Sequence, residues 1–181
     1  MIKGKIKFLL PYAGIPAIGA ALLLLYAGKA DSFILLWCEL IIVFGYIAAI
    51  SDLKSKKIPN SLILSMIAAW AITMVPKLLM DIDAAVVLLK DAAFGFLIGG
   101  GLFLLVYIIS RKGLGGGDVK FMAASGLFIG FAGTLSAMLY GTVLAALAGL
   151  ALLLLKKLGR KDAMPLAPFL YIGMLIAIFY R

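Results

Sequence analysis

Two aspartates and a run of glycines are the residues of this sequence best suited to chemistry. Asp118 follows Gly113-Leu114-Gly115-Gly116-Gly117, and Asp52 ends a long apolar run. Glycine has no Cβ, so the backbone before Asp118 can leave helical geometry and approach another chain closely. Two carboxyl groups that share one proton supply an acid and a base, which is enough to activate water against a peptide bond. Such a pair works only if the fold brings the two aspartates together.

The remaining composition narrows the available chemistry. The chain has no histidine, which excludes Ser-His triads and most transition-metal sites. Its one cysteine, Cys38, can form neither an internal disulfide nor a cysteine-based zinc site. Carboxylates, lysines and hydroxyls remain as catalytic groups, and we predict no metal and no cofactor.

The hydrophobicity of the chain indicates an integral membrane protein. Of its 181 residues 65% are hydrophobic, against roughly 45–50% in soluble domains. Apolar segments alternate with short polar breaks, which predicts one all-α domain over residues 1–181, a polytopic bundle of six to seven spans. The net charge of +9 comes from basic residues scattered in those breaks. We therefore expect contact with membrane lipid and no nucleic-acid partner.

The apolar runs set the predicted spans. Segment 1–30 holds the first, which is either a retained helix or a cleaved signal-like segment, and its length favours retention. Residues 33–181 form the predicted catalytic bundle, in which Pro76 ends the third span. Residues 81–91 are polar at both ends and predict a loop or an interfacial helix. The later spans are expected at 33–50, 62–75, 92–110, 119–132, 135–155 and 167–180.

The charges predict the orientation. With seven spans and a cytoplasmic amino terminus, 13 of the 17 basic residues lie on the cytoplasmic side, which is the positive-inside pattern. Asp52 then ends the second span and Asp118 begins the fifth, both at the cytoplasmic face of the plasma membrane. The two aspartates are predicted on the same side by an argument that uses no motif. The 13 residues are Lys3, Lys5, Lys7, Lys54, Lys56, Lys57, Arg111, Lys112, Lys120, Lys156, Lys157, Arg160 and Lys161.

Three segments carry a family resemblance. The stretch from Gly115 to Asp118 resembles the Gly-x-Gly-Asp signature of aspartyl intramembrane peptidases. With Lys120 after it, and with Asp52 followed by Ile58-Pro59-Asn60, it resembles the type IV prepilin peptidases. Residues 165–169 (Pro-Leu-Ala-Pro-Phe) are similar to a proline-containing motif near that family's carboxyl end. The resemblance implies a catalytic pair, Asp52 and Asp118, and a substrate-binding set of Gly113, Gly115, Gly116, Gly117, Lys120, Pro59 and Asn60.

The resemblance also implies an activity. It is that of a membrane aspartyl endopeptidase that removes a short basic leader from type IV prepilin or pseudopilin precursors. Long members of the family add a domain with Cys-x-x-Cys motifs and methylate the product, so this chain resembles the short form and methylation stays open.

Plainer roles remain for several residues. Lys120 could be an anchor at the lipid interface, and Pro59 could shape a helix start. The aspartates could mark helix ends, with Asp52 paired to Lys56. The alternative function is a small proton- or cation-coupled transporter that uses intramembrane carboxylates such as Glu39.

Overall fold

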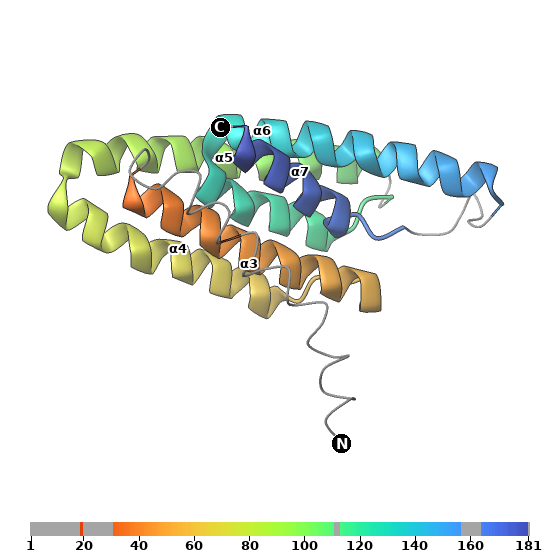
Figure 1. Ribbon diagram of the computed structural model, residues 1–181, viewed down its shortest axis with the longest axis horizontal. Helices are drawn as coiled ribbons and strands as arrows, with labels where there is room; N and C mark the ends of the chain where they lie inside the picture. The colour runs from red at the N-terminus through yellow and green to blue at the C-terminus, as the bar shows by residue number, and fades with distance from the viewer. Residues whose placement is uncertain (1–18, 20–30, 111–112, 157–163, 181) are drawn as a thin grey trace, which may run out of the picture.

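The protein is a bundle of helices (Figure 1). The structure, a computed structural model, describes residues 19, 31–110, 113–156 and 164–180. The helices assigned there are α3 (Ser32–Ser55), α4 (Asn60–Met80), α5 (Ile82–Ile109), α6 (Gly116–Leu154) and α7 (Ala167–Phe179), and these residues include no strand. The all-α prediction is confirmed. Within the described residues, four helices, α3 to α6, are long and apolar enough to cross a membrane, and the number of six to seven spans stays a prediction.

The predicted first span lies outside the described residues, apart from Gly19. This glycine lies against the carboxylate of Glu39 in α3. The second predicted span corresponds to α3, which begins where the Asp31 side chain accepts the N–H of Phe33 at 2.9 Å. It continues past the predicted end to Ser55, so Asp52 lies in its last turn.

Helix α4 continues through the predicted break at Pro76 and ends at Met80, so the predicted end was wrong. Proline removes one intrahelical hydrogen bond, a loss that neighbouring helices make tolerable in membrane proteins. The turn after Pro76 is also held from outside, because the ammonium of Lys77 lies 2.6 Å from the Asp31 carboxylate. This ion pair joins the end of α4 to the start of α3.

The acidic segment 81–91 is the beginning of α5 and not a loop or separate interfacial helix. The Asp81 side chain caps the helix by accepting the N–H of Ala84 at 3.0 Å, and Asp83 lies in the first turn. Acidic groups suit this position because the amino end of a helix carries partial positive charge. The charges that indicated a polar break therefore mark a helix start.

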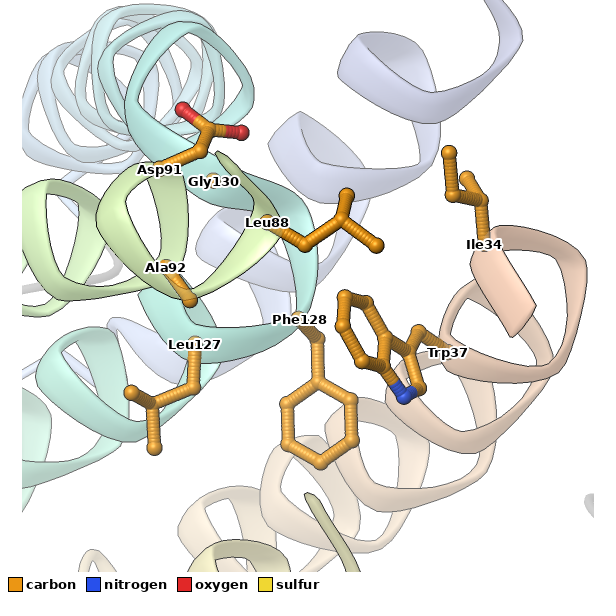
Figure 2. A pocket seen from close by; sticks show the side chains of 8 residues that line it. All are labelled: Ile34, Trp37, Leu88, Asp91, Ala92, Leu127, Phe128 and Gly130. Atoms are coloured by element: carbon orange, nitrogen blue, oxygen red, sulfur yellow. The ribbon is translucent and has the colours of Figure 1, made fainter. Parts of the chain in front are cut away.

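Helix α6 consists of two arms joined at Gly130. This residue has φ 67° and ψ −173°, a conformation open essentially to glycine. The Asp91 carboxylate lies against Gly130 (Figure 2). It also accepts the N–H of Phe131 at 2.9 Å. Met122 and Thr134 both contact the position of a Cβ on Gly99, although a straight helix would separate them by about 18 Å. The arms, 116–129 and 131–154, therefore run in opposite directions (Figure 1).

Small residues allow α5 and the first arm of α6 to touch backbone to backbone. A Cβ on Gly95 would meet the carbonyl oxygen of Gly126, and one on Gly99 would meet that of Met122. This is the close packing expected from the small-xxx-small spacing. The arm is the centre of the core, with Phe121, Met122 and Phe128 fully buried or nearly so. Helix α7 packs against both α3 and α6, and this framework carries the site.

Candidate active site

Asp52 and Asp118 line the same cavity, which has a volume of about 230 Å³. Both side chains are largely buried, with 5% and 8% of their surfaces exposed. A polar cavity of this volume has room for several water molecules. The residues that line it are Asp52, Lys56, Lys57, Ile58, Gly115, Gly116, Gly117 and Asp118.

The position of Asp52 is set by its own helix and by α7. The residue lies in the last turn of α3, and its Oδ2 atom accepts the backbone N–H of Ala167 at 3.0 Å. Ala167 is the first residue of α7, and Pro168 follows it. The positive charge of Lys56 also attracts this carboxyl group. Asp52 thus joins α3 to α7 through a bond between residues 115 positions apart in sequence.

The loop after α3 is fastened to the helix that precedes it. Lys56 adopts a left-handed conformation with φ 51°, and its N–H donates to the Asp52 carbonyl at 2.8 Å. The hydroxyl of Ser51 donates to the carbonyl of Lys57 at 2.8 Å, and the hydroxyl of Ser55 donates to the carbonyl of Ser51 at 2.8 Å. These bonds turn the chain sharply and bury Ile58 beside the cavity.

Asp118 lies in the first turn of α6, directly after the glycines. Its backbone N–H donates to the carbonyl of Gly115 at 3.1 Å. Its Oδ1 atom is buried and has no hydrogen-bond partner within the described part of the chain. A Cβ on Gly115 would lie 2.7 Å from Asp118 Oδ2, closer than real Cβ atoms approach other atoms. A glycine at 115 therefore makes room for the carboxyl group.

The other two glycines of the motif have different surroundings. A Cβ on Gly117 would lie 3.3 Å from Cβ of Ile58, so this glycine lets the two loops of the site pack together. A Cβ on Gly116 would have only Tyr107 near it, at 4.0 Å. Of the three glycines, Gly115 thus has the least space for a Cβ and Gly116 has the most.

The remaining predicted substrate-binding residues lie outside the cavity lining. The ammonium of Lys120 donates to Asn60 Oδ1 at 3.0 Å, which links α6 to the start of α4. Pro59 precedes α4, and its carbonyl accepts the N–H of Leu62 at 3.1 Å. Gly113 packs against Ser110 after the end of α5. These four residues support the elements around the cavity.

The structure also adds groups that the sequence analysis did not assign to the site. Lys56, Lys57 and Ile58 line the cavity, and the N–H of Ala167 holds Asp52. Ile58 and residues 165–169 belonged to the motif segments, so their positions carried a signal. No sequence signal indicated the N–H of Ala167, because a backbone N–H does not depend on the type of side chain.

Two carboxyl groups around one cavity can carry out acid–base hydrolysis. One ionised carboxylate can take a proton from water, and the other, protonated, can donate to a carbonyl oxygen. Asp52 also sits at an unfavourable place for a mere helix-end residue, because the carboxyl end of α3 carries partial negative charge.

Comparisons with known proteins agree with this chemistry. The model of the Type IV leader peptidase family matches residues 38–154, more than half of the chain. Three curated relatives are similar, each named prepilin leader peptidase/N-methyltransferase. The protein of Bacillus subtilis (strain 168) is 28% identical over 74% of this chain and 51% of its own length. The protein of Legionella pneumophila is 30% identical over 71% of this chain and 44% of its own length. The protein of Pectobacterium carotovorum subsp. carotovorum is 34% identical over 76% of this chain and 49% of its own length.

The similarity has a defined extent. The chain spans about half the length of these curated relatives. No solved structure matches it significantly. The family match contains both aspartates of the cavity and the glycines before Asp118. On this match, the chain belongs to the Type IV leader peptidase family.

Proposed function

We propose that this protein is a membrane aspartyl endopeptidase that removes the leader from type IV prepilin or pseudopilin precursors. The observation that carries the proposal is the single cavity lined by Asp52 and Asp118. The names of the three relatives support the choice of substrate. The transporter alternative has no support among the comparisons, and the proposal covers leader cleavage alone.

The proposed reaction follows aspartic acid–base chemistry. One carboxylate accepts a proton from water while the water oxygen attacks the scissile carbonyl, and the other carboxyl gives its proton to the carbonyl oxygen. Collapse of the resulting diol breaks the C–N bond and transfers a proton to the leaving amine. One proton remains on the pair after each turnover, so no cofactor is needed. The bond must leave helical geometry first, because a helix keeps its carbonyls in intrachain hydrogen bonds.

We further propose that the site opens to the cytoplasmic face of the plasma membrane. The supporting observation is the charge bias, which assigns the carboxyl end of α3 and the start of α6 to the basic side. A single domain with six to seven crossings is consistent with this orientation if each arm of α6 crosses separately. A precursor with a basic leader and an apolar helix would present its cleavage bond at that depth.

Leader removal from a co-reconstituted prepilin tests the proposal. Asp52→Asn and Asp118→Asn should each lower the cleavage rate by about 10²–10⁴-fold, because asparagine keeps the shape but cannot exchange the proton. Asp83→Asn serves as the matched control, since this exposed aspartate lies in the first turn of α5 away from the cavity. Substantial cleavage by either cavity variant would remove that residue from the mechanism.

A further inference from the structure

The location of Asp52 is electrostatically unfavourable for an ionised carboxyl group, and α3 itself supplies no group that offsets this. The residue is in the last turn of α3, where the carbonyl groups give the helix end partial negative charge. The residue is only 5% exposed, so its carboxyl group has little contact with bulk water. A donor from another element is needed to hold the carboxyl group in place.

The start of α7 supplies this donor. The Ala167 N–H reaches Asp52 Oδ2 at 3.0 Å. The following residue, Pro168, has no N–H, and the N–H of Phe169 donates to the Leu166 carbonyl at 3.0 Å. Ala167 is therefore the first-turn donor of α7 that is left free for Asp52, and it is fully buried.

Packing on two sides fixes the position of α7. On the side of α3, the ring of Tyr171 fills the space above Gly45, where a Cβ would lie 2.7 Å from it. On the side of α6, Gly173 contacts the carbonyl of Ala137, and a Cβ on Gly141 would lie 2.9 Å from Leu170 Cα. A helix held this closely against both neighbours presents its first N–H groups at a defined place.

We propose that the amino terminus of α7 positions the Asp52 carboxyl group for catalysis, with the backbone N–H of Ala167 as the positioning group. The hydrogen bond occupies Oδ2 and sets the rotation of the carboxyl group, which leaves Oδ1 for water or for the second aspartate. Helix α7 lies beyond residues 38–154, so the family match assigns it no part. The inference rests on the proposed function of Asp52.

An amide-to-ester exchange at position 167 tests the inference with little steric change. Lactic acid, the α-hydroxy analogue of alanine, is introduced by nonsense suppression during cell-free synthesis into liposomes, which replaces the N–H by an oxygen. The matched control is the same exchange at Phe169, which also removes one first-turn hydrogen bond of α7 but none to Asp52.

The expected result is a difference between the two esters in cleavage of a prepilin. The ester at 167 should lower kcat about 10-fold or more with KM changed less than about twofold, because hydrogen bonds to charged groups are strong. The ester at 169 should keep kcat within about threefold of the wild type. Equal effects of the two esters on kcat would overturn the inference.

A stability measurement keeps this test separate from the test of function. If the wild-type protein cleaves no prepilin, the proposed function fails, and the contact is still measured by unfolding. The ester at 167 should lower the unfolding midpoint in the wild-type background and have little effect in an Asp52→Ala background. An ester effect of the same size in both backgrounds would show that Ala167 N–H does not act through Asp52, and the inference would be wrong.

Discussion

Replacing Gly115 by alanine should disable the site while leaving the fold almost intact. Gly115 precedes α6 with φ −73° and ψ 134°, a conformation that alanine adopts without strain. The added methyl group would lie 2.7 Å from Oδ2 of Asp118 and would meet no other residue within 4 Å. The perturbation therefore acts on the carboxyl group and on little else.

The size of the effect follows from that distance. Ordinary contacts of a Cβ begin at 3.4 Å, so the Asp118 oxygen must move by about 3.4 − 2.7 = 0.7 Å. A misplacement of about 1 Å at a reacting group can cost about 100-fold in rate, so we expect kcat to fall by about 10- to 100-fold. Stability should fall by about 1 kcal/mol, because glycine is preferred over alanine at the residue that caps the start of a helix.

Neighbouring glycines supply the controls for this prediction. In Gly116→Ala the new methyl group would have its nearest neighbour, Tyr107, at 4.0 Å, so cleavage should stay near the wild-type rate. In Gly117→Ala the methyl group would lie 3.3 Å from Cβ of Ile58, and a small shift of that side chain should lower the rate slightly. Rates of leader removal are compared at matched expression, with thermal unfolding in detergent as the stability measurement. The reasoning is refuted if Gly115→Ala cleaves as fast as Gly116→Ala.

Three further predictions concern stability. Gly130→Ala should lower the free energy of unfolding by about 2 kcal/mol or more, because alanine is strained at this positive φ. Gly101→Ala is the control and should cause no such loss, because a Cβ on Gly101 would have no atom within 4 Å. Unfolding of both variants by SDS titration measures the difference. The hydrogen bond from Lys77 holds the pKa of Asp31 below its ordinary value of 3.8, so the pair stabilises the fold above about pH 4 and less below it. Lys77→Met should flatten that acid dependence in unfolding scans, and an unchanged pH profile would contradict the role of the pair. Lys56→Gly should raise the free energy of unfolding by about 1 kcal/mol because it relieves a left-handed backbone, and an unfolding midpoint below that of the wild type would contradict this.

The sequence alone could predict that the two aspartates lie on the same side of the membrane. That side depends only on the number of spans between them and on the charges of the loops. Counting apolar runs and basic loops put Asp52 and Asp118 on the same side, and the structure brings them to one cavity. The count used the runs 119–132 and 135–155 as two spans, and the chain does reverse at Gly130, near the predicted end of the first run. The roles of these residues in catalysis stay a prediction.

The boundaries near Pro76 and Asp81 were not predictable from local patterns alone. Proline and acidic residues mark polar breaks in most apolar sequences, and here they lie within or at the start of long helices. The contacts that stabilise the helices at these positions come from residues far away in sequence. Asp31 holds the turn after Pro76 through Lys77, and Asp91 accepts the N–H of Phe131 at the reversal of α6. Pairing of this kind depends on the packed bundle, which a window of neighbouring residues does not contain.

Main-chain groups account for part of what the motifs left out of the site. A motif names side chains, so it identified Asp52 and Asp118 but not the N–H of Ala167 or the space that Gly115 leaves. The proline at 168 is the visible trace of this arrangement, since proline favours the first turn of a helix and cannot itself donate. The short segment 165–169 is thus explained by helix geometry: it begins α7 where a free N–H can meet the carboxyl end of α3.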